Sequence, residues 1–266
     1  MKQTHTYQSI KLSENSFEKI DDTLVVEAPL QININGESYT VVMRTPGNDE
    51  ELVRGLLYAE DICKKKNDLE VTIIKEEKDN STIINVVIPP SKLGKGYMNK
   101  RTLLSVSSCG ICGKKELEDL KVEGNPLQSR LKVSVEMVFT MFLKMNNLQI
   151  LFKDTGGSHA CAIFNSNQEL LTVKEDIGRH NAVDKCIGDL LVRETLKNAA
   201  YMLVSGRVSY EIVSKAFFAK IPVIIAVSAC SSLAVDFAKE FGICLIGFTR
   251  NQKMTIYSNP QYLSCD

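Results

Sequence analysis

The feature that most constrains the fold is a regular alternation of apolar runs and amphipathic stretches from about residue 148 to the C-terminus. Amphipathic helices are expected to begin near His180, Ser209 and Ser231. The apolar runs have strand length and read SHACAIF, ELLTVKED, AYMLVSG, PVIIAVS and ICLIGF. Strands that alternate with helices form a partly parallel sheet covered by helices. The pattern therefore predicts an α/β domain over residues 131–266.

The first part of the chain has a different, β-rich pattern. Strands are expected at 31–34, 39–44, 69–74 and 82–88, with a helix from Asn48 or Asp49. Asn35-Gly36 separates the first two strands, and this dipeptide favours the type I′ turn of a hairpin. The pattern predicts a smaller α+β region over residues 1–90, with antiparallel strands.

A connector is predicted between these two regions, over residues 91–130. Residues 91–114 contain glycine, serine and five basic side chains without a sustained helical or strand period. A short helix is expected at 114–121. A second helix, capped by Ser134 with Val138 and Phe142 on one face, is expected to begin the α/β domain.

The charge balance argues against a nucleic-acid or membrane-surface protein. The 32 basic and 32 acidic side chains cancel, so no overall field attracts polyanions. No apolar run resembles a secretory signal or a membrane span, which predicts a cytoplasmic protein. Most of the eight cysteines lie in apolar runs, where they are expected to be buried and reduced.

Polar segments follow the apolar runs of the α/β domain at five points. They read DTGGSHA after Ile150–Phe152, then EDIGRHNAVDK, SGRVSYE, SACSS and TRNQK. Ligands of open α/β sheets gather beyond the carboxyl ends of the strands. Glycine backbones, helix N-termini and arginines suit phosphate groups. The five segments together predict a nucleotide-like ligand, although each alone also has the composition of ordinary turns, caps and ion pairs.

The candidate binding residues in these segments fall into three chemical classes. Close backbone approach and hydrogen bonding are expected from Gly156, Gly157, His159, His180, Ser205 and Gly206. Phosphate pairing is expected from Arg179, Arg207, Arg250 and Lys253. Hydrogen bonds to a purine or pterin ring are expected from Asp176, Asp184 and Glu211.

The main competing hypothesis for the histidines is that they belong to the metal site of a zinc-dependent deaminase. Such a site needs His or Cys followed two residues later by glutamate, and a later Pro-Cys-x-x-Cys. Here Cys161 stands where the glutamate is required, and Ser228-Ala229-Cys230-Ser231 offers one thiol. The sequence therefore predicts no zinc site.

The most specific chemical feature is the pair Cys109 and Cys112 in SSCGICG. This spacing suits one metal, a small disulfide, or a nucleophile with a resolving thiol. No second CxxC or HxxxH supplies the remaining ligands of a structural zinc. Glycines at 110 and 113 and nearby basic residues favour a reactive thiolate on an adaptable loop. A thiolate that accepts a sulfane sulfur becomes a persulfide, which a neighbouring thiol can attack.

Taken together and in this order, SSCGICG, DTGGSHACAIF, EDIGRHNAVDK, SGRVSYE and GFTR resemble the FdhD family of formate dehydrogenase accessory sulfurtransferases. The resemblance runs from about residue 24 to the end. It implies a cytidine-deaminase-like α/β sandwich that lacks the zinc site, and typically a homodimer.

The resemblance also implies a function. The protein would receive sulfur from a cysteine desulfurase as a persulfide on Cys109, with Cys112 as its companion. It would bind the bis-molybdopterin guanine dinucleotide form of the molybdenum cofactor (Mo-bisMGD), for which GDP is a mimic, and sulfurate it before formate dehydrogenase receives it. The guanine dinucleotide contact maps to Phe248, Thr249, Arg250, Asn251, Gln252 and Lys253. The alternative is a non-enzymatic chaperone that binds the cofactor without carrying sulfur.

Overall fold

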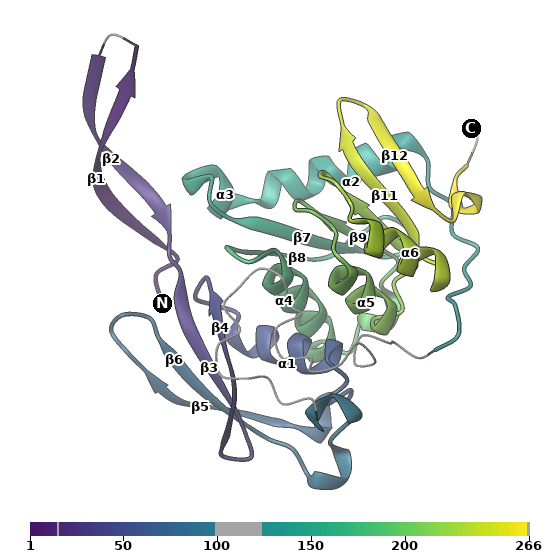
Figure 1. Ribbon diagram of the computed structural model, residues 1–266, viewed down its shortest axis with the longest axis horizontal. Coiled ribbons are helices and arrows are strands. Elements are labelled where there is room, and N and C mark those ends of the chain that lie inside the picture. The colour runs from purple at the N-terminus through teal and green to yellow at the C-terminus, as the bar shows by residue number, and fades with distance from the viewer. Residues whose placement is uncertain (15, 99–123, 265–266) are drawn as a thin grey trace.

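The computed structural model describes residues 1–14, 16–98 and 124–264, and in them the chain forms three separate sheets. A six-stranded sheet with helices on both faces makes the body (Figure 1). A four-stranded sheet with one helix lies against it, and a two-stranded hairpin projects from the junction (Figure 1). The chain is thus a mixed α/β protein, with its N-terminal sheets apart from the C-terminal one.

The six-stranded sheet is mixed, with the strand order β12-β11-β10-β9-β7-β8. Its central strands β9, β10 and β11 run parallel, whereas β7, β8 and β12 pair antiparallel with their neighbours. The strands are β7 (His159–Phe164), β8 (Leu170–Asp176), β9 (Tyr201–Val204), β10 (Val223–Ala226), β11 (Cys244–Arg250) and β12 (Lys253–Ser258). The predicted alternation of strands and helices is confirmed in this part of the chain.

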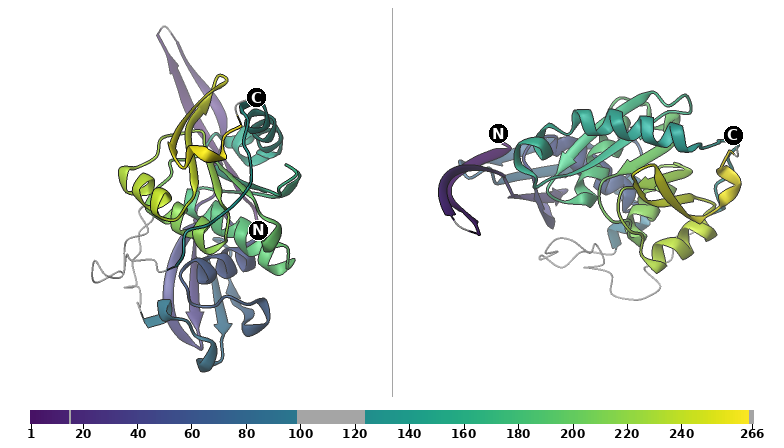
Figure 2. Two further views of the ribbon diagram at one scale, coloured as in Figure 1. Left: turned by 90° about the vertical axis from the view of Figure 1, so that its right-hand side faces the viewer. Right: turned by 90° about the horizontal axis from the view of Figure 1, so that it is seen from above.

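Helices cover both faces of this sheet, as the view from above shows (Figure 2). One face is covered by α2 (Val135–Leu148), which α3 (Ile150–Thr155) follows, and the other by α4 (Arg179–Val192), α5 (Tyr210–Phe218) and α6 (Ser232–Glu240). Alternation along each strand supplies both cores: in β9, Leu203 packs in the α2 layer and Met202 in the α4–α6 layer. The predicted Ser134 cap is confirmed, because its hydroxyl accepts the Met137 N–H at 3.2 Å.

One predicted apolar run is helical rather than extended. Ile150–Phe152 was expected to be a strand before DTGGSHA, but these residues begin α3. The Glu175 carboxylate accepts the N–H groups of Leu151 and Phe152 at 2.9 and 2.8 Å, which satisfies the start of this short helix. Gly156 ends it in the left-handed conformation, with φ of 64°. DTGGSHA therefore links a helix to β7.

The four-stranded sheet has the order β4-β3-β6-β5 and packs one face on α1 (Asp49–Ala59). Its strands are β3 (Ala28–Ile34), β4 (Glu37–Arg44), β5 (Glu70–Glu76) and β6 (Thr82–Val87). The hairpin at Asn35-Gly36 is confirmed, with φ of 53° and 86° as a type I′ turn requires. The expectation of purely antiparallel strands is wrong, because β3 and β6 pair in parallel. Periodicity predicts strands but not which strands pair.

The two regions join through a close crossing of α1 and α4. A Cβ atom on Gly55 would lie 1.9 Å from the Asp184 carbonyl oxygen, and one on Gly188 would lie 1.8 Å from that of Glu51. Real Cβ atoms do not approach oxygen so closely. Glycine at both positions therefore lets the two helix backbones touch.

The hairpin of β1 (Thr4–Ser13) and β2 (Ser16–Val25) was not predicted from the sequence. Its strands pair from Thr4–Val25 to Ser13–Ser16 and leave the body as a long arm (Figures 1 and 2). We call residues 4–25 the arm. The short 3₁₀ turns Pro90–Lys92 and Lys95–Met98 end the first described stretch of the connector.

Candidate functional site

Three of the predicted polar segments meet at one edge of the six-stranded sheet. Since β7 runs antiparallel to β9 and to β8, its first residue lies beside the last residues of both neighbours. His159 opposes Asp176 in the sheet, and Ser205 follows the end of β9. The loop after β8 leads directly into α4, which begins at Arg179. Sheet topology therefore brings together residues that are up to 50 positions apart in sequence.

Ser205 fixes the geometry of this edge. Its N–H donates to the Ala160 carbonyl at 3.0 Å, and its hydroxyl accepts the Ala160 N–H at 2.9 Å. The same hydroxyl lies 3.4 Å from Nδ1 of His159. Ser205 thus extends the β7–β9 pairing by one residue and orients the imidazole.

Gly206 allows a close approach of backbone and side chains. A Cβ atom here would lie 3.2 Å from Cβ and Cδ of Arg179 and 3.3 Å from Nδ1 of His159. The three residues are therefore in direct contact at the carboxyl end of β9. A larger residue at position 206 would push the arginine or the histidine out of place.

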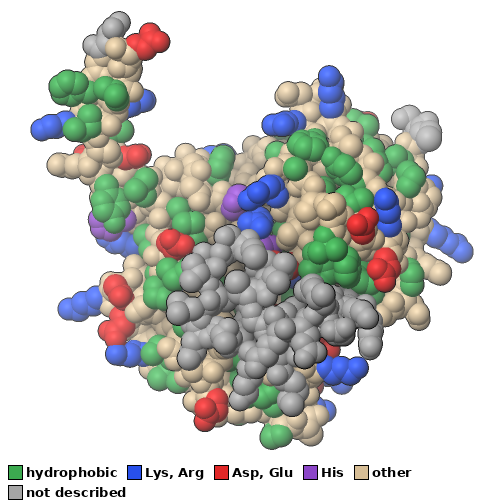
Figure 3. Space-filling view, in the orientation of Figure 1, with side chains coloured by type: hydrophobic (Ala, Val, Ile, Leu, Met, Phe, Trp, Pro, Cys, Tyr) green, Lys and Arg blue, Asp and Glu red, His purple; other side chains and the backbone are tan. Residues whose placement is uncertain are grey.

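Two arginine side chains lie close enough to His159 to affect its protonation. Burial lowers the pKa of its imidazole, and the nearby Arg179 and Arg207 guanidinium groups lower it further, with Asp176 acting in the opposite direction. The imidazole is therefore neutral at pH 7. Histidine and basic side chains gather at the centre of the face in Figure 3. Two fixed cations beside a neutral hydrogen-bonding ring suit an anionic ligand.

His180 belongs to an adjoining group at the start of α5. Its Nε2 lies 3.0 Å from the Ser209 hydroxyl and 3.1 Å from Oε2 of Glu211. Ser209 is the residue before α5, and His180 is in the first turn of α4. The N-termini of two helices therefore point toward the same edge, which favours negative charge there.

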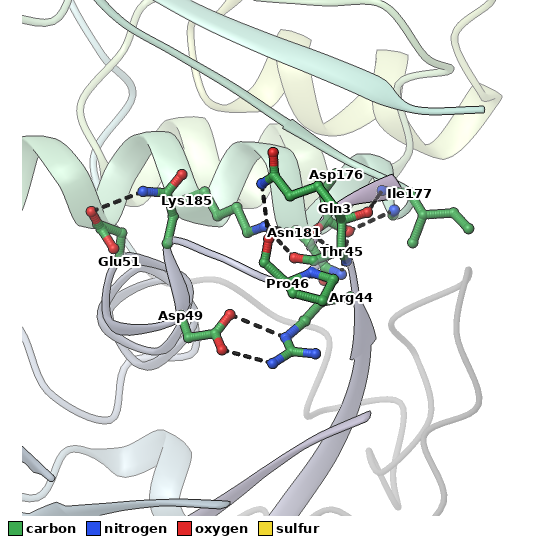
Figure 4. A network of polar contacts seen from close by, with 12 residues as sticks. Gln3, Arg44, Thr45, Pro46, Asp49, Glu51, Asp176, Ile177, Asn181 and Lys185 are labelled. Atoms are coloured by element: carbon green, nitrogen blue, oxygen red, sulfur yellow. Dashed lines mark hydrogen bonds and ion pairs between the residues drawn. The ribbon is translucent and has the colours of Figure 1, made fainter. Parts of the chain in front are cut away.

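Asp176 has a supporting position beneath this edge, in the network of Figure 4. Its two oxygens accept from Thr45 N at 3.1 Å, Lys185 Nζ at 2.7 Å, Gly178 N at 2.8 Å and Asn181 Nδ2 at 2.9 Å. The side chain is fully buried. The structure therefore gives Asp176 four protein donors and the task of holding the loop before α4. Asp184 is likewise buried, and Lys215 Nζ donates to it at 2.6 Å.

The Gly156-Gly157 loop borders the edge on the arm side. A Cβ atom on Gly157 would lie 2.8 Å from Cγ1 of Val25, the last residue of β2. The Ser158 hydroxyl donates to Glu175 at 2.8 Å. This loop leads into His159, so the base of the arm contacts the chain directly before the site.

The segment Phe248–Lys253 forms a hairpin, whereas TRNQK was expected to be a loop at the end of a strand. β11 continues to Arg250, Asn251 and Gln252 turn with φ of 53° and 56°, and Lys253 starts β12. Phe248 is 40% exposed, the Arg250 guanidinium lies 5.9 Å from its ring centre, and Thr249 is buried. The missed strand β12 follows a polar turn that carries no glycine.

This hairpin and the His159 edge are separated by part of the sheet. The Phe248 N–H donates to the Ser228 carbonyl at 3.0 Å, so the segment lies just past the end of β10. Two strands, β9 and β10, lie between β11 and β7. At about 4.8 Å per strand this is a span of about 14 Å, the scale of an extended nucleotide with two phosphates.

Cys109 and Cys112 lie outside the described residues. The described thiols are poor candidates for a carrier. Burial raises the pKa of Cys63 and Cys161, and raises that of Cys230 to about 11 and of Cys244 to about 12. Cys186 is buried and donates to the Cys161 carbonyl at 3.2 Å. Because the thiolate is the reactive form, sulfur chemistry is disfavoured at these positions.

Residues 1–14, 16–98 and 124–264 contain no group of three His, Cys, Asp or Glu side chains arranged to hold a metal ion. None of the helices in these ranges has the length and apolar character needed to cross a bilayer.

The residues that hold Asp176 beneath the edge were not predicted from the sequence. Thr45, Asn181 and Lys185 hold Asp176, and Lys185 Nζ also donates to the Thr45 carbonyl at 2.8 Å. The sequence feature that indicates this support is Lys185, a lysine inside the apolar helix sequence NAVDKCIG. A lysine on a buried helix face needs an acidic partner.

The fold and this site define a class: a mixed α/β protein with a positively charged sheet edge and a β-rich region docked beside it. The chain belongs to the FdhD/NarQ family, whose model matches residues 25–264. The resemblance inferred from the sequence motifs is thereby confirmed.

Curated relatives cover nearly the whole chain. A protein of Saccharolobus solfataricus named sulfur carrier protein FdhD is 40% identical over 260 residues, 96% of each chain. The Streptomyces coelicolor protein of the same name is 38% identical, over 96% of this chain and 94% of its own. A crystal structure of a candidate formate dehydrogenase accessory protein from Desulfotalea psychrophila has the same fold, with a TM-score of 0.75 at 21% identity, covering 99% of this chain and 100% of its own.

Proposed function

We propose that this protein is a sulfur carrier, a sulfurtransferase that takes sulfur from a cysteine desulfurase on Cys109 and passes it to Mo-bisMGD for formate dehydrogenase. The observation that carries the proposal is the positive sheet edge where His159, Arg179, Arg207 and Gly206 meet. The names of the relatives support sulfur carriage. A cytidine-deaminase-like sandwich, a homodimer and a cytoplasmic location belong to the same proposal.

The thiol chemistry falls to Cys109 and Cys112. The Cys109 thiolate attacks the outer sulfur of the desulfurase persulfide, so that the desulfurase leaves as a thiolate and Cys109 carries the S–SH group. The Cys112 thiolate can then attack the inner sulfur of that persulfide. This forms the Cys109–Cys112 disulfide and expels HS⁻, which takes both electrons of the broken S–S bond.

The residues of the sheet edge suit the phosphates of the cofactor. Arg179 and Arg207 supply guanidinium groups, Gly206 lets the ligand approach the backbone, and His159 is a neutral donor or acceptor. Phe248 and Arg250 offer an exposed ring and a cation about 14 Å along the sheet, which suits the guanine end. When bound, the cofactor supplies the molybdenum centre that accepts sulfur.

The sulfur-carrier and chaperone hypotheses predict different results in one measurement. The protein is incubated with a cysteine desulfurase and ³⁵S-labelled cysteine, and then separated under non-reducing conditions. A carrier retains label that dithiothreitol removes, with up to one labile sulfur on each chain. A chaperone that only binds the cofactor retains none, and that result would refute the sulfurtransferase assignment.

Nucleotide binding tests the edge separately from the thiols. At about 100 times its Kd, GDP should stabilise the fold by about 2.7 kcal/mol, which raises the melting temperature by roughly 5–10 °C. Arg207→Ala should lower the affinity for GDP roughly tenfold or more, because a charge-assisted hydrogen bond contributes about 1.5–3 kcal/mol. Arg207 is exposed, so the melting temperature of the free protein should not change.

The matched control is Arg130→Ala, an exposed arginine in the segment that lines the opposite edge of the sheet. This variant should bind GDP as the wild type does. Equal losses in both variants would show that the nucleotide site lies elsewhere, and no thermal shift at millimolar GDP would show that the protein does not bind GDP.

A further inference from the structure

Thr45, directly after β4, uses its N–H, carbonyl and hydroxyl groups on one partner, the segment that leads from β8 into α4. Its N–H donates to Asp176 at 3.1 Å, and its carbonyl accepts from Lys185 Nζ at 2.8 Å. Its hydroxyl accepts the Ile177 N–H at 3.0 Å. Thr45 is fully buried. A residue of the β-rich region is therefore bound directly to the loop before α4 (Figure 4).

The end of β4 is itself held on both sides of Thr45. Arg44 is fully buried, and its guanidinium group donates to the two oxygens of Asp49 at 3.0 and 2.7 Å. Pro46 restricts the residue before it to extended backbone. The Gln3 amide donates to the Pro46 carbonyl at 2.8 Å. Thr45 is therefore a fixed support for the loop that it contacts.

The loop that Thr45 holds leads directly to the sheet edge. Ile177 is followed by one residue and then by Arg179, with which α4 begins. The Arg179 side chain lies against Gly206 and is close enough to His159 to lower the pKa of its imidazole. A shift of the Ile177 backbone would therefore move Arg179 relative to the other residues of the edge.

A second contact with β4 aligns the first turn of α4. The Asn181 amide donates to the Met43 carbonyl at 2.8 Å and to Asp176 at 2.9 Å. Gly178 leaves room for this amide, since a Cβ atom on Gly178 would lie 2.8 Å from Asn181 Nδ2. The end of β4 thus holds the chain at one residue before Arg179 and at one residue after it.

We propose that Thr45 is a positioning residue for ligand binding at the sheet edge. Its hydroxyl holds Ile177 in place, and this in turn keeps Arg179 where it can pair with an anionic ligand. The inference rests on the proposed function, which assigns the phosphates of a nucleotide to Arg179. The β-rich region then contributes to ligand affinity through β4, without contact between Thr45 and the ligand.

Three substitutions in the full-length protein separate the hydroxyl of Thr45 from its methyl group, and all three keep its backbone contacts. Thr45→Val replaces the hydroxyl with a methyl group, Thr45→Ser keeps the hydroxyl without the methyl group, and Thr45→Ala has neither. Without the hydroxyl the Ile177 N–H loses its acceptor, so the loop rearranges. Thr45→Val and Thr45→Ala should therefore lower the affinity for GDP, measured by calorimetry, about fivefold or more. Thr45→Ser should bind GDP as the wild type does.

A second readout needs no nucleotide. Burial lowers the pKa of His159, Arg179 and Arg207 lower it further, and Asp176 raises it. When Arg179 moves away, a cation that lowers this pKa is lost, so the pKa should rise toward its ordinary value. Titration of the His159 imidazole by NMR should show this rise in Thr45→Val and Thr45→Ala. The titration of Thr45→Ser should match the wild type.

The matched control is Thr40→Val, the same substitution at another buried threonine of β4. The Thr40 hydroxyl has no hydrogen-bond partner among the described residues, so this variant should keep the GDP affinity and the His159 titration of the wild type. Thermal unfolding is recorded for every variant, because a role in stability alone would lower the melting temperature without changing either readout. The pair Thr45→Ala and Thr45→Ser differs by the hydroxyl alone and decides the test if Thr45→Val does not fold.

Two results would overturn the proposal. One is a GDP affinity and a His159 titration that are the same in Thr45→Val, Thr45→Ala and the wild type. The other is a loss in Thr45→Ser as large as in Thr45→Ala, which would assign the effect to packing of the methyl group. Absence of GDP binding in the wild type would instead refute the proposed function, and the His159 titration would still test the position of Arg179.

Discussion

Cys109→Ala is expected to abolish both sulfur labelling and the maturation of formate dehydrogenase. The substitution removes the proposed nucleophile, and the described thiols cannot substitute for it because they are buried or have raised pKa values. Activity of the enzyme in cells that carry only the variant should fall to the level of cells without the protein. The measurement is formate oxidation in extracts, alongside the ³⁵S assay.

Two further variants make this result specific. Cys112→Ala should retain labelling but lose release of sulfur, because the resolving thiol is missing. Cys230→Ser is the matched control: a half-buried thiol with a pKa of about 11 in the segment between β10 and α6. This variant should accept the ³⁵S label and support formate dehydrogenase activity as the wild type does. Full activity of Cys109→Ala would contradict the carrier assignment.

Asp176→Ala is expected to destabilise the fold by about 3–5 kcal/mol, because it leaves the Lys185 ammonium buried without its partner. For a chain of this size the melting temperature should fall by roughly 10 °C or more. Asp176→Asn should lose a comparable amount, since it keeps an acceptor for Thr45 but not the negative charge. Thermal unfolding measures both.

The control for this prediction is Glu77→Ala, which removes the exposed partner of an exposed lysine, Lys75. Such surface pairs contribute about 0–1 kcal/mol, so the melting temperature should barely change.

The Asp176→Asn variant also distinguishes a supporting role of Asp176 from direct contact with the ligand. If Asp176 holds the loop before α4, the affinities of this variant for GDP and for ADP should fall together. A selective loss of GDP would show that Asp176 contacts the guanine ring, as the sequence suggested.

The parts of the fold that follow from local patterns were predicted well. The apolar runs of β7 to β11 and the helices near His180, Ser209 and Ser231 are confirmed, because burial on one face leaves a clear period in the sequence. Ile150–Phe152 was misassigned because three apolar residues suit a strand or a helix equally. Glu175 decides between them, from 24 positions away.

The parts that depend on distant pairing were not predictable from one sequence. The parallel pairing of β3 with β6 and the contact of Thr45 with Asp176 join segments about 50 and 131 positions apart. The arm has few turn signals and mixed faces, so its strands left little pattern. For the site, residue chemistry predicted His159, Arg179 and Arg207 as candidates, but only topology shows that they meet.

Sulfur carriage by Cys109 is tested most directly by one measurement. The protein is treated with a cysteine desulfurase and cysteine, alkylated and digested, and the peptide that contains positions 109 and 112 is sequenced by tandem mass spectrometry. We predict an added mass of about 32 Da, one sulfur atom, on Cys109. An unmodified peptide, or added sulfur on Cys112 alone, would contradict the account.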